Sequence, residues 1–309
     1  MSNTNEIYAK NLMKRADARM KPSLMRWKPN YDEAIELYED AARAYRASNN
    51  FKMACEAEEK SADANVRLDN YWHAGKALER ATELLTKCEP LDGGAVLQMA
   101  ERANDAYVMA NRTQVGAESL SRAARLLETS DTKTSAALLM LCVENLQEDG
   151  KDVYASDHHK QLGATLVRAE RYQDAAEACV KYGASCARAG QMNSLAKAYL
   201  SAIIALLYDG DGVGAQATFN DVHELPGFDK SEERETAYRL LTAYRAADAD
   251  KIKYAIEDSS CARFLDIVFS RLARKLPNPK HELGAVATKM GADLPTGDTT
   301  DEDAGDDLT

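Results

Sequence analysis

The side chains best suited to catalysis or metal binding are scattered through this sequence of 309 residues. Its histidines lack the spacing that brings several ligands to one metal ion, and they are His73, His158, His159, His223 and His281. Two adjacent histidines point about 100° apart on a helix, so the pair at 158 and 159 makes no site. We find no glycine-rich phosphate loop followed by Lys-Ser or Lys-Thr, and no Gly-x-Ser-x-Gly turn. The sequence therefore predicts a protein that is not an enzyme and that uses neither a metal ion nor a cofactor.

The cysteines form no Cys-x-x-Cys pair, and several fall where an apolar core is expected. They are Cys55, Cys88, Cys142, Cys179, Cys186 and Cys261. We expect buried, reduced thiols, as in a protein of a reducing compartment. No apolar run reaches the roughly 18 residues of a membrane span, and the first residues lack the apolar core of a signal peptide. These features predict a cytoplasmic protein.

An aromatic residue follows an asparagine at intervals of about 20 residues, at Tyr31, Phe51 and Tyr71. Such self-similarity is typical of repeat proteins. Each asparagine is suited to cap a helix, because its side-chain oxygen can accept a hydrogen bond from a free amide of the first turn. After the two tyrosines, apolar residues recur every three or four positions, which predicts one buried helical face. These residues are Ala34, Ile35, Tyr38, Ala41, Ala42 and Tyr45, and then Ala74, Gly75, Leu78, Ala81 and Leu85.

The face that follows Phe51 is weaker, because Glu58 stands where its neighbours have Tyr38 and Leu78. We expect this helix to be partly solvated. The pattern returns at Tyr172, which is followed by Ala175, Ala176, Cys179, Tyr182, Gly183 and Cys186. One helix with its turn takes about 20 residues, so a hairpin takes about 40. The sequence thus predicts an all-α, tetratricopeptide-like solenoid of antiparallel helix hairpins.

The ends of the array differ from its repeats. We expect a first helix over residues 1–20, a loop over 21–29, and repeats over 30–212. The pattern loosens after Gly214, and residues 213–276, with a last helix from 263 to 276, are expected to form a helical bundle that covers the end of the array. Residues 277–309 are expected to be an acidic, disordered tail, in which HELGAVATKMGADL at 281–294 is a weak helix candidate. From Gly297 the tail is too acidic and too poor in apolar side chains to fold alone.

The loop over residues 21–29 carries apolar side chains among basic ones. Two prolines enclose Leu24, Met25 and Trp27, and Lys21, Arg26 and Lys28 lie among them. Apolar residues on a basic loop suit an anionic membrane surface, where tryptophan lies at the interface. The alternative is that Leu24 and Trp27 pack against the first hairpin.

The net charge of −11 is unevenly placed. Residues 277–309 contain eight acidic residues and two lysines, a balance of −6, so the rest of the chain carries only −5. A protein with this charge lacks the basic surface of a general nucleic-acid binder. The acidic tail ends in Asp306, Asp307, Leu308 and a threonine, and a segment of this kind orders only against a partner that supplies cations and an apolar pocket.

With the array and its two ends in view, the sequence resembles the soluble NSF attachment proteins, and most closely their gamma form. The resemblance is carried by LMRWKPNYDEAIELYEDAARAYRASNNFKMACEA at 24–57, by LPGFDKSEE at 225–233 and by LLTAYRAADADKI at 240–252. It extends over residues 5–276. It implies a right-handed sheet of antiparallel helices with a C-terminal helical bundle. It also implies an adaptor that binds SNARE helical bundles and recruits the hexameric ATPase NSF, without hydrolysing ATP itself.

The resemblance also implies site residues. Arg112 aligns with a basic SNARE-contacting residue of the alpha form, whereas Glu118 and Asp157 replace two lysines, so Lys160 and Arg168 are the expected substitutes. The residues expected to contact NSF are Asp306, Asp307 and Leu308, and those expected to contact the membrane are Leu24, Met25 and Trp27. The resemblance therefore also implies that the protein associates peripherally with membranes. The alternative is a generic tetratricopeptide-like scaffold that binds another helical or peptide partner.

Overall fold

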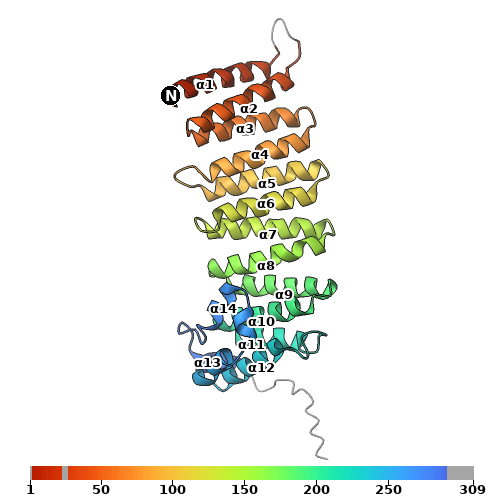
Figure 1. Cartoon of the computed structure of the whole chain (residues 1–309), viewed down its shortest axis with the longest axis vertical. Helices are drawn as coiled ribbons and strands as arrows, with labels where there is room; N and C mark the ends of the chain where they lie inside the picture. The colour runs from red at the N-terminus through yellow and green to blue at the C-terminus, as the bar shows by residue number, and fades with distance from the viewer. Residues whose placement is uncertain (1, 23–26, 291–309) are drawn as a thin grey trace, which may run out of the picture. The chain divides into compact units, whose positions relative to one another are not determined.

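The computed structural model of the chain describes residues 2–22 and 27–290, and every regular element in these ranges is a helix (Figure 1). This confirms the predicted all-α fold of antiparallel helix hairpins. The chain divides between Arg171 and Tyr172 into two compact units, each described separately below. No helix of the described ranges combines the length and the apolar composition needed to cross a bilayer.

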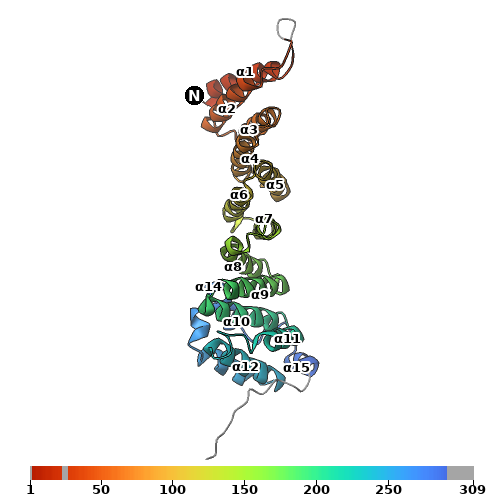
Figure 2. The ribbon, with the colours of Figure 1, turned by 90° about the vertical axis from the view of Figure 1, so that its right-hand side faces the viewer.

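Over its described residues, the first unit is a stack of eight helices, each packed on the next (Figure 1). Contacts between α4 and α6, and between α5 and α7, show that alternate helices lie in two layers, as Figure 2 shows for this unit. Helices of one layer therefore run in the same direction. The eight helices are α1 (Ser2–Arg19), α2 (Tyr31–Ala47), α3 (Phe51–Val66), α4 (Tyr71–Leu85), α5 (Gly93–Met109), α6 (Thr113–Leu127), α7 (Thr132–Glu148) and α8 (Asp152–Arg168).

The predicted asparagine caps are present at two of three helices. Asn30 accepts a hydrogen bond from the amide of Glu33 at 3.2 Å, and Asn50 accepts one from the amide of Met53 at 3.2 Å. Asn70 occupies the same position before α4, but its side chain makes no capping hydrogen bond, so that part of the prediction is wrong. All three helices still begin at the predicted aromatic residue.

The first unit packs small side chains against large ones. The alanines of the predicted faces are buried, and so are Tyr38 and Tyr107. A Cβ atom added at Gly75 would lie 2.9 Å from the ring of Tyr107, so only glycine allows α4 and α5 to approach this closely. The Tyr107 hydroxyl donates a hydrogen bond to Glu79 at 2.8 Å, which fixes the ring against that glycine.

The second unit is built around α10 (Met192–Tyr208), whose residues are buried without interruption from Ala198 to Leu207. A helix that is apolar on all sides has to be surrounded by others. It contacts α9 (Tyr172–Arg188), α11 (Gly212–Val222), α12 (Glu232–Arg245) and α14 (Ile267–Ala273). The helix α13 (Ala249–Glu257) packs on α12.

The structure differs from the sequence-based expectation near the end of the chain. The helix expected from 263 to 276 is instead a 3₁₀ turn, η1 (Cys261–Phe264), followed by α14. Asp266 separates them because its side chain accepts a hydrogen bond from the amide of Val268 at 3.1 Å and caps α14. The weak helix candidate at 281–294 contains α15 (Leu283–Met290), which contacts α11 and α12 and buries Val286 and Met290.

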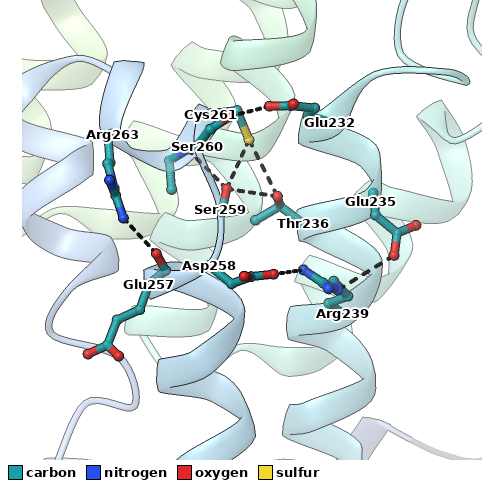
Figure 3. A network of polar contacts seen from close by, with 11 residues as sticks. Glu232, Glu235, Thr236, Arg239, Glu257, Asp258, Ser259, Ser260, Cys261 and Arg263 are labelled. Atoms are coloured by element: carbon teal, nitrogen blue, oxygen red, sulfur yellow. Dashed lines mark hydrogen bonds and ion pairs between the residues drawn. The ribbon is translucent and has the colours of Figure 1, made fainter.

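A buried polar cluster fixes the turn that joins α13 to η1 (Figure 3). The Ser259 hydroxyl lies 2.9 Å from the Thr236 hydroxyl and 3.1 Å from the Cys261 sulfur. Burial raises the pKa of the Cys261 thiol, although both hydroxyls act in the opposite direction. Five of the six cysteines are buried and Cys88 is partly buried, as the sequence predicted for most of them.

We expect Gly75→Ala to lower the stability of the protein by about 1–3 kcal/mol. The added methyl group would overlap the ring of Tyr107, and the hydrogen bond to Glu79 prevents the ring from moving aside. The measurement is thermal unfolding followed by circular dichroism. The matched control is Gly94→Ala, whose Cβ would meet Asp92 at an ordinary 3.4 Å and should leave melting unchanged or slightly raised. Equal melting of both variants would contradict the close packing of α4 and α5.

Candidate functional site

The helices α2, α4, α6 and α8 present one common surface of the first unit, here called the even-helix face. Because one hairpin takes about 40 residues, side chains that far apart lie next to each other on this face. Arg80 meets Glu39 at 3.2 Å, 41 residues away, and Arg122 meets Glu79 at 2.7 Å, 43 residues away. Arg168 pairs with Glu128, which lies 40 residues away in the sequence. A ladder of ion pairs thus connects successive helices of this layer.

Beneath the ladder lies Glu58 of α3, the residue that led us to expect a partly solvated helix. The expected solvation does not apply to Glu58 itself, whose side chain is only 3% exposed. The Arg80 Nε atom lies 2.9 Å from each carboxylate oxygen of Glu58. Burial raises the pKa of Glu58, and the Arg80 guanidinium opposes that shift. The buried carboxylate is tolerated because α4 supplies a cation at the position where it is needed.

Between α4 and α6 the even-helix face is hollowed into a groove of about 430 Å³. Its walls carry both charges, with Glu79 and Glu83 on one side and Arg122 and Arg125 on the other. Leu126 adds an apolar side chain that is 49% exposed. The groove therefore offers charge and apolar contact together.

A second hollow, of about 440 Å³, lies where α4 and α6 begin. It is lined by Trp72, Ala110, Arg112 and Val115. The Trp72 ring packs edge-on against the Tyr107 ring, with centroids 5.4 Å apart, and the Lys76 amine lies 4.9 Å from the Trp72 ring centre. We call this hollow the Trp72 pocket.

The three residues expected to bind a SNARE bundle do not form one cluster. Arg112 is exposed just before α6, Lys160 is exposed near the middle of α8, and Arg168 lies in the last turn of α8. Because α6 and α8 run in the same direction, Arg112 and Arg168 lie at opposite ends of the layer, about 25 Å apart along the helix axes. Arg168 is also engaged with Glu128. A partner that met all three would have to extend across the face.

The other expected contact residues lie mostly beyond the structural description. Leu24, Met25, Asp306, Asp307 and Leu308 fall outside the described residues. Trp27 is described and is 93% exposed. Trp27 therefore does not pack against the first hairpin, whereas the alternative also named Leu24, which lies outside the described residues.

Sequence analysis missed the Trp72 pocket and the buried pair of Glu58 and Arg80. The sequence did contain a signal for the Trp72 pocket, because Trp72 follows the aromatic residue that begins a predicted helix. Val115 lies 43 residues further on, at the spacing that brings side chains of α4 and α6 together. The ion pair of Glu58 and Arg80 could not be predicted from the sequence, because it depends on the register of α3 against α4.

Stacked helix hairpins with a groove between alternate helices define a helical-repeat protein. The family model described as "Soluble NSF attachment protein, SNAP" matches residues 8–261. The chain therefore belongs to the soluble NSF attachment protein family, as its sequence motifs indicated.

Individual relatives agree with this assignment. The chain is 34% identical to the gamma-soluble NSF attachment protein of Arabidopsis thaliana over 289 residues, which cover 94% of this chain and 98% of the relative. It is 26% identical to the protein of the same name from Dictyostelium discoideum, over 92% of this chain and 86% of the relative. It is also 26% identical to the vesicular-fusion protein SEC17 of Komagataella phaffii, over 80% and 84% of the two chains. Within the family, the likeness to the gamma form is thus confirmed.

We expect Arg80→Met to lower the free energy of unfolding by about 2–3 kcal/mol at neutral pH, because it leaves the Glu58 carboxylate buried without its cation. The loss should shrink as the pH falls toward 5. Burial holds the pKa of Glu58 above its unfolded value, so the folded state takes up a proton first and gains stability as the pH falls. Denaturant unfolding at several pH values measures both effects.

Two further variants act as controls for this pair. Adding Glu58→Gln to Arg80→Met should recover most of the loss and remove its pH dependence. Arg122→Met breaks a more exposed pair with Glu79 and should cost less than about 1 kcal/mol. An equal loss for Arg80→Met and Arg122→Met would mean that Glu58 is not the source of the effect.

Proposed function

We propose that this chain is an adaptor that binds SNARE complexes and recruits and stimulates the NSF ATPase. It would thereby promote SNARE disassembly in vesicle fusion and intracellular protein transport. The observation that supports this function is membership of the soluble NSF attachment protein family over residues 8–261, with gamma-form relatives matched along nearly their whole length. The chain would act on the cytoplasmic side of membranes as a peripheral protein.

The even-helix face is the surface we propose for the SNARE bundle. It extends across four parallel helices, so an elongated helical partner can lie across it. Arg112 and Lys160 have no carboxylate partner among the described side chains, whereas the ladder engages Arg80, Arg122 and Arg168. Arg112 and Lys160 are therefore the stronger candidates of the expected set, and Arg168 would have to exchange Glu128 for a carboxylate of the partner.

The function is tested by mixing the purified chain with a fluorescently labelled soluble SNARE complex, NSF and ATP. We expect ATP-dependent disassembly that requires the chain, together with faster ATP hydrolysis by NSF. Binding of the SNARE complex without NSF isolates the first step. A chain that neither binds SNARE complexes nor supports their disassembly would overturn the proposal and favour a scaffold for another partner.

Leu308→Ala tests the proposed contact of Asp306, Asp307 and Leu308 with NSF. The substitution removes an apolar side chain and leaves the charge unchanged, so it should do nothing if the acidic residues serve only solubility. If the tail contacts NSF, stimulated ATP hydrolysis and disassembly should fall while SNARE binding persists. Raised salt should weaken the acidic part of the contact. Full-rate disassembly by the variant at limiting protein would contradict this role.

The joint replacement of Leu24, Met25 and Trp27 by Ser tests the proposed membrane contact. Disassembly of SNARE complexes anchored in liposomes with anionic lipids should slow, because the loop loses its interfacial side chains. Disassembly of soluble SNARE complexes should be unaltered and serves as the control. An equal loss in both assays would show that these side chains act within the protein.

A further inference from the structure

The Trp72 pocket is a rigid hollow at the edge of the even-helix face. The Trp72 ring rests on the Tyr107 ring, with an interplanar angle of 66°. Tyr107 is itself held by its hydrogen bond to Glu79 and by its contact with Gly75. A partner that enters the pocket would therefore meet walls that are already ordered, which lowers the entropy cost of binding.

Unpaired positive charge surrounds this pocket. Arg112 is exposed and makes no ion pair among the described side chains, and the Lys76 amine lies over the Trp72 ring at 4.9 Å from its centre. Arg112 also precedes the first turn of α6, where the free amides of the helix favour negative charge. Elsewhere on the face, Arg80, Arg122 and Arg168 are engaged with carboxylates of neighbouring helices.

Another aromatic residue, which is exposed, lies further along the same edge as the partly buried Trp72. Ser121 contacts Gln161 at 3.4 Å, and Glu128 pairs with Arg168, so α6 and α8 align with an offset of 40 residues. This register places Tyr154, in the first turn of α8, beside the first turn of α6. Tyr154 is 56% exposed. A rod-shaped partner that crosses the starts of α4, α6 and α8 would therefore meet Trp72, Arg112 and Tyr154 in turn.

We infer that the Trp72 pocket is an anchor for an acidic amphipathic helix. A large apolar side chain of that helix enters between Trp72 and Val115, and a carboxylate about one turn away meets Arg112. The volume of about 440 Å³ is sufficient for one such side chain. The inference rests on the proposed function, because it makes this pocket the place where the chain grips one helix of the SNARE bundle.

The anchor has a consequence that separates it from a purely basic surface. Contacts between exposed charges weaken as salt is added, whereas burial of an apolar side chain against an aromatic wall does not. Binding of the helical partner should therefore contain a component that resists salt and depends on Trp72. A second component, which depends on Arg112, should decline with salt.

The test is the dissociation constant of a labelled soluble SNARE complex, measured with the full chain at about 50 mM and 300 mM salt. Trp72→Ala should weaken binding roughly tenfold or more at both salt concentrations, as truncation of a central aromatic side chain does in other interfaces. Arg112→Glu should weaken binding strongly at low salt and much less at high salt. Tyr8→Ala removes an aromatic side chain of equal exposure to Tyr154 from α1 and should leave binding unchanged.

The outcomes separate the inference from the function on which it rests. If the unaltered chain does not bind the SNARE complex, the proposed function fails. If it binds and both Trp72→Ala and Arg112→Glu bind equally well, the anchor is overturned. Thermal melting shows whether Trp72→Ala is still folded. If it is not, the dissociation constant of Trp72→Phe is measured instead, because this variant keeps an aromatic ring against Tyr107. That variant should show an intermediate loss, and unchanged binding of Trp72→Phe alongside a misfolded Trp72→Ala would also overturn the anchor.

Discussion

The close approach of antiparallel helices through alanine and glycine is the constraint on which the first unit depends. A helix that presents Ala34, Ala41, Ala74 or Ala81 to its neighbour leaves room for only a few large side chains, and Tyr38 and Tyr107 occupy that room. Gly75 allows one such close contact, against the Tyr107 ring. The same ring supports Trp72 at the surface, so the packing inside the unit determines the shape of the pocket outside it.

The regular hairpin length has a second consequence, which is electrostatic. It brings arginines of α4, α6 and α8 next to carboxylates of the preceding helix of the same layer, so much of the charge on the even-helix face is neutralised within the protein. Exposed pairs of this kind contribute little stability individually. Their larger effect is on recognition, because they leave few cations free to attract an acidic partner. Arg112 and Lys160 are among those that remain.

The second unit follows a different rule. Its central helix, α10, is apolar on every side and is enclosed by neighbours instead of lying in a layer. The polar cluster of Thr236, Ser259 and Cys261 then fixes the turn after α13, where hydrogen bonds replace the regular hairpin contacts (Figure 3). The boundary between units falls between Arg171 and Tyr172, inside the segment of 30–212 that was expected to be one array.

The sequence by itself determined the helical class, the starts of helices at Tyr31, Phe51 and Tyr71, and the family, because spacing along one chain is a local property. It could not determine which helix meets which. Glu58 interrupts the apolar pattern of its own helix, and only the register of α3 against α4 places Arg80 beside it. The Trp72 pocket likewise needs two helices whose side chains are 43 residues apart. Tertiary structure decided these features, since burial and pairing depend on neighbours that lie far away in the sequence.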